Sequence, residues 1–96
     1  MHPYELMFIM HPSLEQPEQE AMVERVKALI ETGKGTITEV KLWGKRRLAY
    51  EIADQREGFY VLVNYEAEPH VSKEIDRVLR IAETVIRFMI VRTDES

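Results

Sequence analysis

The alternation of two hydrophobic periodicities along this 96-residue chain constrains its fold more than any other feature. Apolar residues recur at strand or helix spacing in six segments, in the order strand, helix, strand, strand, helix, strand. This order is the split βαβ pattern of α+β proteins. Because crossover connections are right-handed, it predicts a four-stranded antiparallel sheet with the first and third strands central and the other two at the edges. Both helices are expected on one face of that sheet.

The two helices are expected to begin near Pro17 and Pro69, since a proline lacks the backbone N–H and suits a first helical turn. Each helix carries an apolar stripe at helical spacing that would face the sheet. Gly33 is expected to end the first helix in a left-handed conformation. The two stripes comprise Met22, Val23, Val26, Leu29 and Ile30 in the first helix, and Val71, Ile75, Val78, Leu79 and Ala82 in the second.

The strands differ in pattern and length. The first, over residues 4–10, is apolar at both parities, which predicts burial on both of its faces. The second spans 36–52, with a bend or bulge at Gly44. A turn at 54–58 leads into the third strand, so these two strands form a hairpin. The last strand covers 85–91 and alternates apolar residues between its two sides.

Length and composition narrow the class of protein. Residues 1–92 are predicted to form a single small α+β domain, followed by a short polar tail at 93–96. The absence of cysteine excludes disulfides and thiolate chemistry, and is typical of a reducing cytoplasm. No apolar run approaches the roughly 20 residues of a membrane helix, and the N-terminus has no signal pattern. The chain is therefore expected to be cytoplasmic and not to bind a membrane.

Catalytic and metal-binding patterns are missing from the sequence. The three histidines, His2, His11 and His70, are far apart and do not show metal-ligand spacing. No histidine stands beside a serine in a way that would suggest a nucleophilic triad. The residues themselves therefore give no support for a metal, a cofactor, a small-molecule substrate or an enzymatic activity.

The charge of the chain is unevenly distributed. The net charge is −4, yet residues 1–33 carry six acidic and two basic side chains, whereas residues 34–92 carry eleven basic and nine acidic ones. The acidic side chains gather on the first helix, so the remaining surface can be locally basic and attract a polyanion. The sheet face without helices must also carry some large aromatic side chains, and an uncovered apolar face indicates a partner. The candidates for that face are Tyr4, Trp43, Phe59, Tyr60, Tyr65 and Phe88.

Two groups of cations stand out. Lys45, Arg46 and Arg47 are flanked by aromatic residues, which favours contact with RNA phosphates and stacking on bases. The alternative is a solvated edge strand protected by charge, and three adjacent cations on a strand point to both faces. The second group, Arg77, Arg80 and Arg87, either forms a phosphate-binding rim or, more commonly for such residues, pairs with neighbouring carboxylates.

Four sequence segments carry a family resemblance. The longest is the run WGKRRLAYEI at 43–52, preceded by YELM at 4–7 and followed by GFY at 58–60 and LRI at 79–81. In this order, and spanning nearly the whole chain, they resemble the family of protein six of the bacterial small ribosomal subunit.

The resemblance implies a fold, a function and two sets of site residues. It implies a ferredoxin-like βαββαβ sandwich without catalysis. It also implies binding to the central domain of small-subunit ribosomal RNA as a heterodimer with small-subunit ribosomal protein eighteen. The RNA-binding candidates carried over are Lys45, Arg46, Arg47, Arg80 and Arg87, with His2 and Tyr4 at the N-terminus. The partner-binding candidates are Trp43, Tyr50, Phe59 and Tyr60.

Two other classes of protein share this fold pattern. One is a small enzyme, such as an acylphosphatase-like hydrolase or a dimeric ferredoxin-like oxygenase, because fold alone does not exclude catalysis. Such a phosphatase needs a glycine-rich anion loop after the first strand, whereas residues 11–15 are acidic and lack glycine. The other is a homodimeric module that binds a small molecule on the open sheet face.

Overall fold

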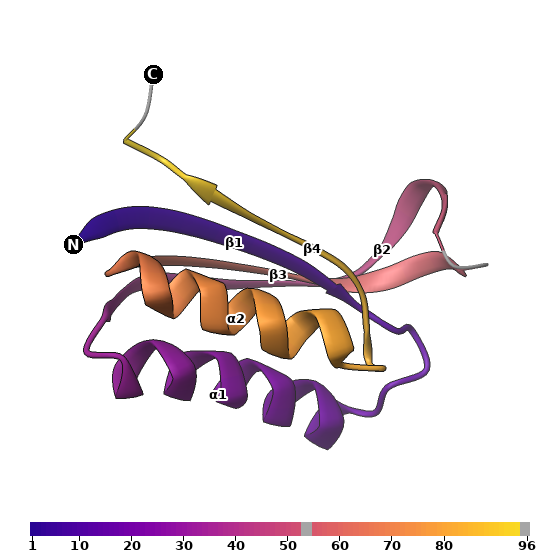
Figure 1. Ribbon diagram of the computed structural model, residues 1–96. Coiled ribbons are helices and arrows are strands. Elements are labelled where there is room, and N and C mark those ends of the chain that lie inside the picture. Colours follow the sequence, from indigo (N-terminus) through magenta and orange to yellow (C-terminus); the bar gives the residue numbers. More distant parts are fainter. Residues whose placement is uncertain (53–54, 95–96) are drawn as a thin grey trace.

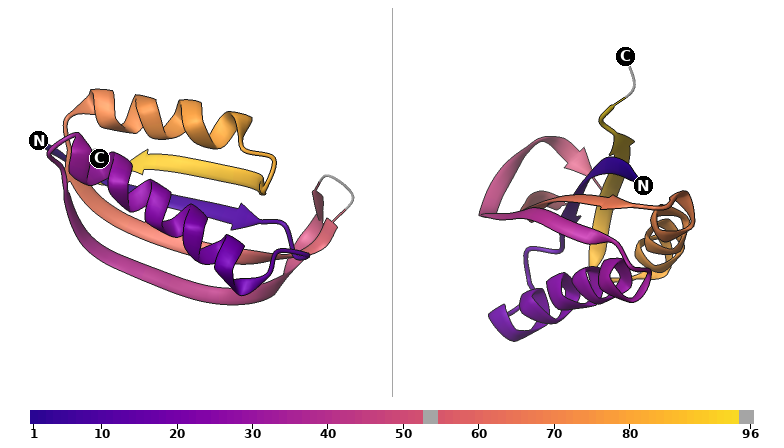
Figure 2. Two further views of the ribbon diagram at one scale, coloured as in Figure 1. Left: turned by 90° about the horizontal axis from the view of Figure 1, so that it is seen from below. Right: turned by 90° about the vertical axis from the view of Figure 1, so that its left-hand side faces the viewer.

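Alternating strands and helices build a two-layer α+β sandwich. The structure is a computed structural model and describes residues 1–52 and 55–94. In chain order its elements are β1 (His2–Met10), α1 (Gln16–Thr32), β2 (Thr36–Ile52), β3 (Gln55–Ala67), α2 (Pro69–Ile81) and β4 (Val85–Arg92). The strands lie in the order β2-β3-β1-β4, with antiparallel pairing throughout. This confirms the predicted sheet, and both helices lie on the same face (Figures 1 and 2).

The core lies between this sheet and the two helices. In β1 every second side chain from Tyr4 to Met10 points into it, and the apolar stripes of α1 and α2 pack against the same layer. The buried helical side chains are Val23, Val26 and Ile30 in α1, and Val71, Ile75, Val78 and Leu79 in α2, while Met22 and Leu29 pack partly buried against the same core. The predicted stripes are confirmed except for Ala82, which follows the end of α2 as its extended C-cap.

Tyr65 places a phenol inside this core. Its side chain is only 1% exposed and stacks on Tyr4, with 5.4 Å between ring centroids. The Tyr65 hydroxyl lies 2.7 Å from Ser72 Oγ, so the buried polar atom has a hydrogen-bond partner. Burial raises the pKa of Tyr65 because it disfavours the phenolate, and the hydrogen bond to Ser72 acts in the opposite direction.

The end of α1 differs from the prediction. The sequence predicts a left-handed Gly33, but its φ is −81°, and the left-handed residue is Lys34 with a φ of 65°. The N–H of Gly35 donates to the carbonyl of Ile30 at 2.8 Å, and the N–H of Lys34 donates to the carbonyl of Glu31 at 3.0 Å. This is the bonding pattern of a Schellman cap whose left-handed residue is Lys34. The small size of Gly33 matters for another reason, because a Cβ there would lie 2.5 Å from Val71 Cγ2.

Gly35 is confined by backbone as well as by side chains, which leads to a prediction about stability. A Cβ at this residue would lie 2.8 Å from the carbonyl oxygen of Glu66 and 3.0 Å from Ala67 Cβ. Because the backbone oxygen cannot move aside like a flexible side chain, we expect Gly35→Ala to lower the free energy of unfolding by about 1–3 kcal/mol. Urea titration followed by circular dichroism measures this change. The control Gly44→Asn meets nothing within 4 Å, so it should lower the free energy of unfolding only by the cost of the left-handed φ of 76°, about 1 kcal/mol or less for asparagine.

The hairpin between β2 and β3 is longer than expected. The predicted turn at 54–58 is wrong for residues 55–58, which are the first residues of β3, while residue 54 lies outside the described part of the chain. Arg47 pairs with Glu57 and Ile52 with Gln55, so charged residues that are typical of a turn continue the ladder instead. We call residues 45–52 and 55–58 the hairpin arm. Figure 1 shows the arm bending to the side of the sheet opposite the helices.

Candidate RNA and protein interface

The sheet face opposite the helices is apolar and only partly covered. Two rows of side chains cross it, because neighbouring strands pair Tyr60 with Ile9 and Ile9 with Arg87, and likewise Leu62 with Met7 and Met7 with Met89. Several large apolar side chains on this face or its edges are exposed: Trp43 by 42%, Met89 by 49% and Val91 by 43%. An uncovered row of this kind is typical of a protein-binding surface.

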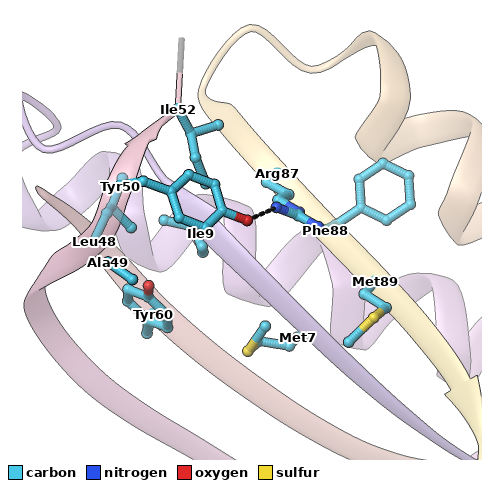
Figure 3. A pocket seen from close by; sticks show the side chains of 10 residues that line it. All are labelled: Met7, Ile9, Leu48, Ala49, Tyr50, Ile52, Tyr60, Arg87, Phe88 and Met89. Carbon is cyan, nitrogen blue, oxygen red and sulfur yellow. Dashed lines mark hydrogen bonds between the residues drawn. The ribbon is translucent and has the colours of Figure 1, made fainter. Parts of the chain in front are cut away.

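The hairpin arm covers one end of this face. Leu48 of the arm is only 6% exposed, and Ile9 on the sheet beneath is 3% exposed. The burial on both faces predicted for β1 is therefore found at its C-terminal end, while Met7 remains partly exposed. A guanidinium N–H of Arg87 on β4 donates to the Tyr50 hydroxyl at 3.2 Å and links the arm to the far edge of the sheet (Figure 3).

The aromatic residues proposed for the open face divide between the two sides. Trp43 and Tyr60 stack on the open side, with 6.4 Å between ring centroids. Tyr4 and Tyr65 are buried in the core, and Phe59 and Phe88 pack against that core from the helix side. Of the partner-binding candidates, Trp43, Tyr50 and Tyr60 thus lie on the open side or its arm, whereas Phe59 lies on the other side.

The cations at 45–47 also divide between the two sides. Lys45 Nζ lies 5.3 Å from the centre of the Phe59 ring, whereas the guanidinium of Arg46 lies 5.6 Å from the centre of the Trp43 ring. Arg46 also donates from Nε to the carbonyl of Trp43 at 3.4 Å. Within the described part of the chain neither Arg46 nor Arg47 forms an ion pair, so both guanidiniums are available to an anionic partner.

The helical arginines are paired with carboxylates. Arg77 lies 2.5 Å from Glu74, and its hydrogen bond lowers the pKa of Glu74. Arg80 lies 2.9 Å from Asp76 and also covers the Phe88 ring at 5.6 Å. These pairs are exposed and contribute little to stability, so a phosphate could replace the carboxylate without a large cost. In the second cation group, then, carboxylate pairing is found for Arg77 and Arg80.

The N-terminal candidates lie at the opposite end of the sheet. His2 pairs in register with Ala67, eight positions before the Met10–Phe59 pair next to the arm. Tyr4 has its ring in the core and is 9% exposed. The structure therefore brings Arg46, Arg47, Tyr50 and Arg87 to one end of the molecule, and does not bring His2 or Tyr4 to them.

Residues 1–52 and 55–94 contain neither a metal-binding cluster nor a membrane-spanning helix. No group of three histidine, aspartate or glutamate side chains there could hold a metal ion. No helix described by the structure is both long and apolar enough to cross a membrane.

The burial of Leu48 on the open face was not predicted from the sequence. A signal for it is present, because the apolar residues Leu48, Tyr50 and Ile52 alternate along the arm and so share one side of the strand.

Three comparisons with known proteins agree with one another. A family model described as "Ribosomal protein S6" matches residues 3–92. Proteins named "Small ribosomal subunit protein bS6" are similar: that of Clostridium perfringens is 46% identical, and that of Clostridium kluyveri is 48% identical, each over 99% of this chain and 100% of the relative. A crystal structure of 30S ribosomal protein S6 from Thermotoga maritima superposes with a TM-score of 0.90 at 36% identity. It covers 95% of this chain and 86% of that one.

Proposed function

The chain belongs to the ribosomal protein S6 family, and from this we propose that it binds the central domain of small-subunit ribosomal RNA together with small-subunit ribosomal protein eighteen. Membership makes the chain a structural protein of the small ribosomal subunit, located in the bacterial cytoplasm, rather than an enzyme. The enzymatic alternative is therefore wrong.

The observation that carries the proposal is the position of available cations beside an exposed apolar face. Arg46 and Arg47 lie on the arm that borders this face, and Arg87 lies across it. Guanidiniums bind phosphates through two parallel hydrogen bonds, while apolar side chains such as Met89 gain most from a protein surface. One end of the molecule can thus contact RNA and a protein partner at the same time.

The acidic composition of the chain explains why a partner is needed. With a net charge of −4, the chain as a whole repels RNA, and α1 contributes Glu18, Glu20 and Glu24 to the side turned away from the arm. A basic partner on the open face would extend the cationic surface that RNA meets. RNA affinity is therefore expected to be coupled to partner binding.

We expect the chain to bind a central-domain fragment of small-subunit ribosomal RNA at least about tenfold more tightly when protein eighteen is present at saturating concentration. Fluorescence anisotropy of the labelled fragment measures both affinities, and protein eighteen alone and a duplex RNA of unrelated sequence serve as controls. The same affinity with and without protein eighteen would contradict the proposed heterodimer.

A further inference from the structure

A concave apolar pocket lies under the hairpin arm, on the open face of the sheet (Figure 3). Its volume is about 180 Å³. Sheet residues form its floor, the arm forms its roof, and one side opens beside the exposed Met89. The lining side chains are mostly apolar: Met7, Ile9, Leu48, Ile52, Tyr60 and Met89.

The walls of this pocket are held in place before anything binds. Ile9 of β1 and Leu48 of the arm both line the pocket and are almost fully buried, at 3% and 6% exposure. The hydrogen bond from Arg87 to Tyr50 ties the arm to β4 at 3.2 Å across the pocket. A site that keeps its shape when empty loses little conformational entropy on binding, which favours affinity.

The size and chemistry of the pocket fit one aromatic side chain. An apolar cavity of about 150 Å³ is large enough to bind benzene, so 180 Å³ can hold a phenyl ring. The thioethers of Met7 and Met89 make favourable contacts with ring edges, and the guanidinium of Arg87 can lie over a ring face. A nucleobase fits less well, because its polar edge would lose hydrogen bonds to water among apolar side chains.

We propose that this pocket is the anchor site for a single aromatic side chain of the protein partner. The inference rests on the proposed heterodimer and adds the residue type that the partner inserts. A buried aromatic anchor surrounded by weaker contacts is the usual arrangement of an interaction hot spot. Around the pocket those weaker contacts would come from the half-buried Leu62, in the same row as Met7 and Met89, and from the exposed Val91 in the next row.

The first test fills the pocket from its floor. Met7→Trp places a large ring in the space that the partner would use, whereas Met7→Leu keeps the volume and serves as the matched control. By isothermal titration calorimetry with protein eighteen, Met7→Trp should bind about 30-fold more weakly than the wild type, and Met7→Leu should bind within about threefold of it. Met89→Trp fills the same space from a more exposed position and replaces Met7→Trp if that variant does not fold.

The second test uses benzene as a probe and does not involve the partner. In a chain labelled with ¹³C at the methionine methyls, benzene should shift the Met7 and Met89 signals and leave Met22 on the helix side unchanged. The Met89 shift should disappear in Met7→Trp. Equal shifts at Met22 and Met89, or unchanged partner affinity in both filled variants, would overturn the anchor site. Failure of protein eighteen to bind the wild type would instead overturn the heterodimer, even if benzene enters the pocket.

Discussion

Replacing Arg46 and Arg47 together by alanine is expected to weaken RNA binding by the heterodimer about 100-fold at low salt. Both guanidiniums lack an ion pair within the described part of the chain, so they do not have to leave a carboxylate to reach a phosphate. A hydrogen bond to a charged group contributes about 1.5–3 kcal/mol, and removing two such bonds of about 1.5 kcal/mol each corresponds to roughly this change.

The salt dependence of binding distinguishes direct contact with phosphates from a general electrostatic attraction between the heterodimer and the RNA. Each guanidinium removed from a phosphate should flatten the plot of log affinity against log salt concentration by about 0.7–0.9, so the slope of the double variant should fall by up to about 1.8. Replacing Arg25 and Lys27 of α1 removes the same charge from the helix side and is the matched control. Direct binding is refuted if both double variants show the same decrease in affinity and in slope.

Replacing Phe8 by alanine is expected to lower the free energy of unfolding by about 3–5 kcal/mol. Phe8 is 0% exposed and pairs with Val61 on one side and Phe88 on the other, at the centre of the sheet. The decrease combines the transfer free energy of the ring with the cavity left among neighbours that cannot collapse. In a domain of this size the decrease is a large share of the total stability.

Urea unfolding followed by circular dichroism measures this decrease, and the slope of the transition shows whether it remains two-state. Leu42→Ala is the control, because Leu42 lies on the edge strand with 65% of its surface exposed and should cost less than about 0.5 kcal/mol. If Phe8→Ala costs less than about 1 kcal/mol, the core is not packed as described.

Local patterns predict the elements of the fold because each depends on neighbours in sequence. The helical stripes and the alternation of β4 follow from periods of 3.6 and 2 residues, and both are found. The predicted cap of α1 is wrong by one residue: Lys34 takes the left-handed conformation, and Gly33 is required instead for its small size beside Val71. The predicted turn is wrong for residues 55–58 because charged residues also occur in exposed strand pairs such as Arg47 with Glu57.

The candidate site is predictable as a set of residues but not as an arrangement. The basic run and its flanking aromatics are visible in the sequence, and so is a strand irregularity at Gly44. The sequence does not show to which face of the sheet each of these side chains points, since a register shift of one residue exchanges the two faces of a strand. Leu42 pairs with Val61 on the helix side, and after the shift Lys45 takes that side while Arg46 turns to the open face.

The sequence by itself thus determined the order of the elements, the sheet topology and the basic character of the second strand, since these follow from local periodicity and from the handedness of connections. Only the tertiary structure decided that the arm folds over Ile9, that Tyr50 meets Arg87, and that a pocket lies between them. The physical reason is distance along the chain: Tyr50 and Arg87 are 37 positions apart, and the bulge at Gly44 sets which side chains the arm brings to the sheet.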